Sequence, residues 1–177
     1  MKSNKQETGI AVIGAGGIGN LRAHSCKQIT QVDYIAVCDI EDKKLEKVAE
    51  SVKADIATNN YSEAIENDRV GAVIISTDEE NHYDVTMKAV ELGKSVLIEK
   101  PFVLDLGEAD NILAKAKQTG ADVFVGYTQR FRRKFLLAKE AVRRGQLGDI
   151  VFSMGKIYVT RAVGEAVAGR SPNTTPS

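Results

Sequence analysis

The 177-residue sequence has few of the features that mark secreted, metal-binding or nucleic-acid-binding proteins. Its two cysteines, Cys26 and Cys38, are too few for a disulfide framework and lack the Cys-x-x-Cys spacing of a zinc site, so no metal site is expected. Lysine plus arginine equals aspartate plus glutamate, at 24 each. The net charge of zero therefore gives no electrostatic reason to bind nucleic acid or an anionic membrane.

Long apolar runs are also missing. The first eight residues are polar and lack the apolar segment of a secretory signal. No run approaches the ~20 apolar residues that a membrane-spanning helix needs. Together with the cysteine count, these absences predict a cytoplasmic protein in a reducing compartment.

What the sequence does have is a regular alternation of apolar runs and amphipathic segments. Six short apolar runs are predicted strands, at residues 10–13, 34–38, 56–58, 71–76, 96–98 and 123–125. Segments of helical periodicity lie between them, and in the first the spacing of Ile18, Leu21 and Cys26 predicts a helix that ends at about Gln28. This alternation predicts an α/β fold, a doubly wound parallel sheet with helices on both faces.

A glycine-rich turn follows the first predicted strand. Gly14, Gly16 and Gly19 match G-x-G-x-x-G, the turn that opens a nucleotide-binding βαβ unit. The first glycine permits the tight bend, the second lets the backbone approach a pyrophosphate, and the third lets the helix pack against the strand. The free N–H groups of the helix then hold the anion. Glycine turns after strands are common, so the motif needs support from elsewhere in the chain.

Asp39 gives that support, because it ends the second predicted strand twenty residues after Gly19. A carboxylate at that position accepts hydrogen bonds from the adenosine ribose, and the alternative is a helix cap or a solvated loop acid. Ile40 follows in place of an arginine, which favours NAD over NADP. Lys43 and Lys44 keep NADP open, unless both lie on the solvated face of a helix.

Polar residues also end the fourth and fifth predicted strands. Ligands of open α/β sheets collect at this edge, where the strand order reverses, which here is expected between the first and fourth strands. Ser76 and Thr77 either line the nicotinamide half of a cofactor site or bond to their own loop backbone. After the fifth strand, Lys100 either binds a substrate oxygen and transfers a proton or forms a surface ion pair with Glu99.

The last fifty residues have a different character. A helix is predicted over residues 133–144, and the alternation of residues 149–160 predicts a strand with one covered face. A single strand cannot form a stable sheet. We therefore expect a dinucleotide-binding domain over residues 1–126, followed over residues 127–177 by a connecting helix and the start of a truncated α+β domain.

The glycine turn, Asp39, the Ser-Thr strand end and the Glu99-Lys100-Pro101 turn together resemble the Gfo/Idh/MocA family of NAD(P)-dependent oxidoreductases. Residues 126–131 and 145–150 extend the resemblance, which covers about residues 9 to 160. It implies a Rossmann fold with NAD as cofactor, NADP being the alternative. It also implies hydride transfer to or from a hydroxyl or carbonyl carbon of a sugar, cyclitol or related small molecule.

The resemblance implies roles for single residues as well. Lys100 would be catalytic and would contact both the nicotinamide ribose and the substrate. The implied cofactor-binding residues are Gly14, Gly16, Gly17, Ile18, Gly19, Asp39, Ser76, Thr77, His82, Glu99 and Lys100. The family's second-domain sheet mediates oligomerisation, so the full-length protein is expected to be a homo-oligomer.

The sequence also departs from the family pattern. The family's Thr-Pro-Asn-x-x-His reads Thr-Asp-Glu-Glu-Asn-His at residues 77–82, and Thr128 replaces the usual asparagine before Arg-Phe. His82 is thus either a pocket residue or a core histidine. The family's second domain carries a carboxylate–histidine pair, but this chain's histidines, His24 and His82, both lie in the predicted nucleotide-binding half.

We therefore expect the chain to be the cofactor-binding half of a longer oxidoreductase. A non-enzymatic NAD(P)-binding sensor or regulatory module is the alternative. A Rossmann domain for coenzyme A or S-adenosylmethionine is disfavoured by the combination of Asp39 with Glu99-Lys100-Pro101.

Overall fold

The computed structural model describes residues 8–156 and 158. The chain divides into two compact units, Met1–Gln129 and Arg130–Ser177. All strands of the described residues lie in the first unit, which also contains the predicted nucleotide-binding motifs.

The first unit is built on one six-stranded parallel sheet with the strand order β3-β2-β1-β4-β5-β6. The strands are β1 (Gly9–Ile13), β2 (Tyr34–Cys38), β3 (Ile56–Thr58), β4 (Val70–Ile75), β5 (Ser95–Ile98) and β6 (Val123–Val125). Each boundary lies within one residue of its prediction. The order reverses between β1 and β4, where Ile13 pairs with Ile75. The doubly wound α/β fold and the expected place of its reversal are both confirmed.

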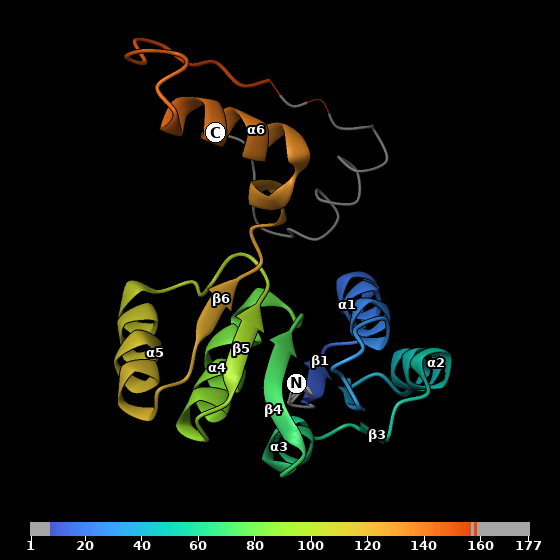
Figure 1. Ribbon diagram of the computed structural model, residues 1–177. Helices are drawn as coiled ribbons and strands as arrows, with labels where there is room; N and C mark the ends of the chain where they lie inside the picture. The colour runs from blue at the N-terminus through green and yellow to red at the C-terminus, as the bar shows by residue number, and fades with distance from the viewer. Residues whose placement is uncertain (1–7, 157, 159–177) are drawn as a thin grey trace, which may run out of the picture. The chain divides into compact units, whose positions relative to one another are not determined.

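Helices cover both faces of this sheet (Figure 1). They are α1 (Gly17–Lys27), α2 (Asp42–Val52), α3 (Tyr61–Glu66), the 3₁₀ turn η1 (Glu79–Asn81), α4 (His82–Glu91) and α5 (Leu106–Thr119). Helices α1 and α2 pack with Val12, Val37 and Ile74 in one cluster of buried side chains. Helices α3, α4 and α5 pack with strand residues one position away, such as Ile13 and Ile75, in a second cluster. The two clusters follow from the alternation of side chains along each strand.

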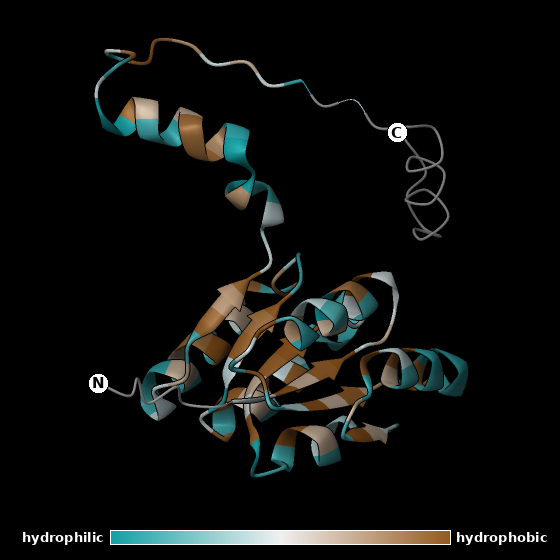
Figure 2. Ribbon diagram, turned by 45° about the vertical axis from the view of Figure 1, so that its right-hand side comes forward, coloured by the Kyte–Doolittle hydropathy of each residue, from teal (hydrophilic) through white to brown (hydrophobic). Residues whose placement is uncertain are grey.

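Because both faces of the four central strands are covered, these strands need continuous apolar runs rather than alternating ones, whereas the edge strands β3 and β6 leave Ala57 and Phe124 exposed. Figure 2 shows this distribution, with hydrophobic colour along the strands and hydrophilic colour on the outer sides of the helices. Alternating and continuous patterns thus distinguish one-sided from two-sided burial, which is why these short strands could be read from the sequence.

The helix predicted from Ile18, Leu21 and Cys26 is confirmed as α1, although these three residues do not share one buried face. Ile18 and Leu21 are 49% and 58% exposed, whereas Gly19, Ala23 and Cys26 are buried. The helix lies so close to the preceding turn that a Cβ on Gly19 would come within 1.7 Å of the Gly14 carbonyl oxygen. A helix at that distance can turn only small side chains toward the sheet, so its larger apolar residues face outward.

The second unit contains α6 (Arg133–Arg143), and the 3₁₀ turn η2 (Thr128–Phe131) spans the junction. The strand predicted over residues 149–160 is wrong for residues 149–156 and 158, which form neither helix nor strand; residues 157, 159 and 160 lie outside the described part. A strand needs a hydrogen-bonded neighbour, and the described residues of this unit include no second strand to pair with it.

Candidate functional site

A cavity of about 280 Å³ lies at the carboxyl edge of the sheet, beside the strand reversal. It is lined by the ends of β1, β2 and β4 and by the loops that follow them. Of the predicted site residues, it brings together Gly14, Gly16, Asp39, Ser76 and Thr77. Its described lining does not include the other predicted residues, which are Gly17, Ile18, Gly19, His82, Glu99 and Lys100.

The glycine turn forms one wall of the cavity. Gly14 has a φ of 93°, and a Cβ there would lie 2.6 Å from the Ser76 carbonyl oxygen, so the position requires glycine. Gly16 caps α1 without a side-chain hydrogen bond, and a Cβ on it would meet nothing within 4 Å. Gly14 is therefore needed for packing, whereas Gly16 leaves open space beside the first N–H groups of the helix, as a bound pyrophosphate requires.

Asp39 is fixed at the end of β2 by three contacts. Its carboxylate accepts hydrogen bonds from Ala15 N at 2.6 Å and Glu41 N at 2.8 Å, and Asn59 Nδ2 donates to its carbonyl oxygen at 2.9 Å. The cap of α2 is Glu41, so Asp39 does not fill the alternative role of helix cap. The bond to Ala15 joins the carboxylate to the glycine turn, and its remaining lone pairs are open to a ribose.

The hydroxyl oxygens of Ser76 and Thr77 are buried and, within the described residues, have no hydrogen-bond partner. The alternative in which they bond to their own loop is therefore not seen. Buried polar atoms in folded proteins are nearly always paired, because an unpaired one costs about 1–3 kcal/mol. Both residues line the cavity, and neither hydroxyl has a competing hydrogen bond among the described residues.

Glu99 and Lys100 occupy the end of β5 but do not pair with each other. Arg22 of α1 binds the Glu99 carboxylate, with Nε 2.9 Å from Oε1 and Nη2 on the same oxygen. Lys100 is exposed, and among the described residues its side chain has no hydrogen-bond or ion-pair partner. The Lys100–Pro101 peptide bond is cis. The ion pair leaves the Lys100 ammonium group available, which is the arrangement that binding a substrate oxygen requires.

Sequence reasoning missed Arg22. The available signal was its position on the helix that the glycine turn opens, three residues after Gly19. Arg22 lies midway along the helix that begins at this edge of the sheet, and a partly buried carboxylate that follows a strand there needs a cationic partner. The charged end of β5 is thereby joined to the helix that begins at the glycine turn.

His82 is 1% exposed and lies between two loops. Its Nδ1 is 2.8 Å from the Pro101 carbonyl oxygen, and its Nε2 is 3.2 Å from that of Thr77. These contacts favour the core histidine among the two interpretations. Direct contact between His82 and a cofactor stays a prediction.

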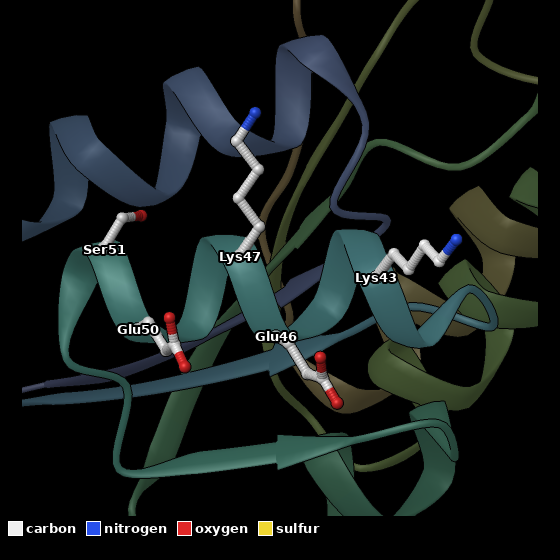
Figure 3. A pocket seen from close by; sticks show the side chains of 5 residues that line it. All are labelled: Lys43, Glu46, Lys47, Glu50 and Ser51. Carbon is white, nitrogen blue, oxygen red and sulfur yellow. The ribbon is translucent and has the colours of Figure 1, made fainter.

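A second hollow, of about 480 Å³, lies on the exposed side of α2. Its lining residues are Lys43, Glu46, Lys47, Glu50 and Ser51, all from one helix (Figure 3). Charges of both signs three and four residues apart are typical of a solvated helix face. We therefore place the site at the smaller cavity, where several elements contribute side chains.

The described residues form no helix that is long and apolar enough to cross a membrane. Within the same part of the chain, no group of three or more His, Cys, Asp or Glu side chains is placed to hold a metal ion.

Comparison with known proteins agrees with this geometry. A family model described as "Oxidoreductase family, NAD-binding Rossmann fold" matches residues 8–127. Myo-inositol 2-dehydrogenase of Thermotoga maritima is 31% identical over 139 residues, which are 78% of this chain and 42% of that protein. NAD(+)-dependent scyllo-inositol 2-dehydrogenase of Bacillus subtilis is 30% identical over 146 residues, 82% of this chain and 43% of that protein.

Among solved structures, scyllo-inositol dehydrogenase from Lactobacillus casei with bound NAD(H) and scyllo-inositol superposes with a TM-score of 0.76 at 22% identity. The match covers 81% of this chain and 43% of that one, and at this identity it supports the fold alone. The chain thus spans less than half the length of the relatives it matches. The family model covers well over half of this chain, and the chain therefore belongs to the Gfo/Idh/MocA family of oxidoreductases with an NAD-binding Rossmann fold.

Proposed function

We propose that this chain is the NAD-binding half of a dehydrogenase that oxidises a hydroxyl-bearing carbon of a small polyol, of which a cyclitol is the best example. The observation that carries the proposal is the cavity at the strand reversal, with a fixed carboxylate at Asp39 and buried, unpartnered hydroxyls at Ser76 and Thr77. The relatives named as inositol dehydrogenases support the substrate class.

In this proposal each part of the cavity would hold one part of NAD. The Asp39 carboxylate would accept hydrogen bonds from the adenosine ribose hydroxyls. The open space at Gly16 and the first N–H groups of α1 would hold the pyrophosphate. Ser76 and Thr77 would bond to the nicotinamide half, which would remove the cost of their unpaired hydroxyls. When bound, NAD supplies the hydride acceptor.

Lys100 is the proposed catalytic residue. Its ammonium group stands at the carboxyl end of β5 without a partner among the described residues, so it can donate a hydrogen bond to the substrate oxygen. Arg22 positions it indirectly by holding the neighbouring Glu99. The proton acceptor for the substrate hydroxyl is proposed to lie in the second domain that the family resemblance implies.

The proposal is tested by titrating NAD, S-adenosylmethionine and coenzyme A separately into the purified chain in a calorimeter. We expect NAD to bind and neither of the other two compounds to bind. Only NAD has an adenosine ribose, a pyrophosphate and a nicotinamide to match the three proposed parts of the cavity. Tighter binding of S-adenosylmethionine or coenzyme A than of NAD would contradict it.

Turnover is tested separately with NAD and myo-inositol or scyllo-inositol. The 177-residue chain is expected to bind NAD but to reduce it at a negligible rate. A longer form that binds NAD and still oxidises neither polyol would favour the sensor alternative. A homo-oligomeric full-length protein and a cytoplasmic location stay predictions.

A further inference from the structure

We propose that Glu41 is a second determinant of the preference for NAD over NADP, and that it acts by holding the Lys44 ammonium group in an ion pair. NADP carries a phosphate on the adenosine ribose, where NAD has a hydroxyl. Lys44 is the cation that could receive this phosphate. The inference rests on the proposed function, namely that the Asp39 end of the cavity binds an adenosine ribose.

Glu41 is fixed from both sides. Its backbone N–H donates to Asp39 Oδ1 at 2.8 Å, so the residue that would hold the ribose also sets the position of Glu41. Its side-chain Oε1 receives the Lys44 Nζ in an i,i+3 ion pair across the first turn of α2. Asp39, Glu41 and Lys44 are thus one connected unit along the wall of the cavity.

The charge balance of the cavity depends on this pair. Its described lining contains four acidic residues, Asp39, Glu41, Asp78 and Asp84, and one basic residue, Lys44. The hydrogen bond with Glu41, followed by the charges of Glu41, Asp39 and Asp78, raises the pKa of Lys44. The ammonium group therefore already interacts favourably with carboxylates. A ribose phosphate, which adds about 1.5 to 2 negative charges, would meet a wall of net negative charge.

The neighbouring lysine does not offer the same possibility. Lys43 lines the other hollow, on the exposed face of α2 together with Glu46 and Lys47, and Figure 3 shows these side chains on that face. Ile40 is 87% exposed and presents no charge. The sequence offered two lysines that could favour NADP. Only Lys44 lines the cavity, and its ammonium group is paired with Glu41.

The expected effect is moderate, because the ion pair is exposed. The Lys44 and Glu41 side chains are 48% and 58% exposed, and ion pairs of this kind are worth little in water. Glu41→Gln should improve NADP binding roughly threefold to fivefold and change NAD binding less than twofold. Asp39 still repels the phosphate in that variant, so the release of Lys44 should have its full effect only when Asp39 is also replaced.

The experiment measures the Kd of NAD and of NADP by calorimetry for the whole chain and four variants. These are Glu41→Gln, Asp39→Ser, the double variant D39S/E41Q and the triple variant D39S/E41Q/K44M. Serine at position 39 keeps an oxygen that can accept the Glu41 N–H. We expect D39S/E41Q to bind NADP roughly tenfold more tightly than D39S, and K44M to abolish that gain. Glu46→Gln and Lys43→Met, on the other face of the same helix, should change neither Kd.

The outcomes separate the two proposals. If D39S/E41Q binds NADP no better than D39S, or if the gain survives K44M, then Glu41 does not act through Lys44 and the inference is overturned. If the unaltered chain binds NAD but the Glu41 variants show no change in the Kd of NADP, the proposed function stands without the inference. If the unaltered chain binds neither dinucleotide, both fail.

Discussion

The two ends of the candidate cofactor site differ in how their polar groups are partnered. At the end of β2, Asp39 has three hydrogen bonds, to Ala15, Glu41 and Asn59. At the ends of β4 and β5, the hydroxyls of Ser76 and Thr77 and the ammonium group of Lys100 have none within the described residues. In the free chain, Asp39 at one end of the site already has hydrogen-bond partners, whereas the polar groups at the other end have none within the described residues.

This difference indicates that the two ends of the site contribute to ligand binding in different ways. A site whose side chains are already held loses little conformational freedom when the ligand arrives, so the Asp39 end is suited to give affinity. Unpaired buried hydroxyls lower the stability of the free chain and are compensated when a matching ligand binds. The stability of the Ser76–Lys100 end should therefore depend on which ligand is bound.

The largest expected effect comes from removing the Asp39 carboxylate. Asp39→Ala removes the ribose acceptor together with the carboxylate that holds Ala15 N and Glu41 N. We expect NAD affinity to fall roughly 100-fold, about 2.7 kcal/mol, as for the loss of hydrogen bonds to a charged group. Calorimetry of the variant measures this, with Glu46→Gln as the matched control. An unchanged Kd would remove Asp39 from the site.

The next effect concerns the anchor behind Lys100. Arg22→Met leaves Glu99, whose side chain is 15% exposed, as an uncompensated charge. Fully buried pairs lose 3–5 kcal/mol in this way, so with partial exposure we expect a loss of about 2 kcal/mol in the free energy of unfolding. Urea denaturation measures it, and R22M/E99Q should recover part of the loss.

The control is a more exposed pair of the same unit. Lys88 pairs with Glu66, with side chains 31% and 52% exposed. Lys88→Met should cost less than 1 kcal/mol. Equal losses for R22M and Lys88→Met would show that Arg22 is only a surface charge.

A smaller effect is expected at Thr77, where a substitution should raise the stability of the free chain instead of lowering it. Thr77→Val replaces a buried, unpaired hydroxyl by a methyl group of the same shape. We expect the free chain to gain about 1 kcal/mol of stability while NAD binding weakens about fivefold. Thr86→Val is the matched control, because the buried Thr86 hydroxyl donates to the His82 carbonyl oxygen at 2.6 Å and its removal should destabilise. A loss of stability in both variants would mean that Thr77 has a partner after all.

The last effect is absent at neutral pH. Burial raises the pKa of the Cys38 thiol to about 12, and the charges of Asp39 and Glu63 add to this. Below about pH 8.5 the thiol is protonated in both folded and unfolded chains, so it has no effect. Between there and pH 12 only the unfolded chain loses the proton, so stability should fall with pH, by at most about 1.4 kcal/mol per unit.

Urea denaturation at pH 8 and pH 10 measures that slope. Cys38→Ala should lower stability at both values because it removes buried volume, but it should reduce the difference between them. A difference that is the same in both proteins would assign the pH dependence to other groups.

The sheet could be predicted from the sequence because two-sided burial leaves a local signature. Runs such as residues 71–76 have no polar position to interrupt them, and the strands they predicted lie within one residue of those in the structure. Asp39 could be predicted because its place relative to the glycine turn follows from the βαβ unit alone. Both inferences depend on residues close together in the chain.

The features that could not be predicted depend on residues far apart. The buried face of α1 is set by how closely the helix approaches the Gly14 turn, and the spacing of the helix's own residues does not reveal that distance. The partner of Glu99 is Arg22, 77 residues away. Residues 149–156 alternate like a strand, but alternation describes only a side-chain pattern, and a strand forms only where another strand supplies hydrogen bonds.

His82 has a consequence for how the edge of the sheet can move. The loop after β4 and the loop after β5 both place a carbonyl oxygen against the same buried imidazole, at Thr77 and at Pro101. Separating the loops would pull one of these carbonyl oxygens away from the ring and expose polar atoms that are now buried, which is costly. Both loops therefore pack against one buried side chain, so a displacement of the Lys100 turn would also act on the loop that holds Thr77.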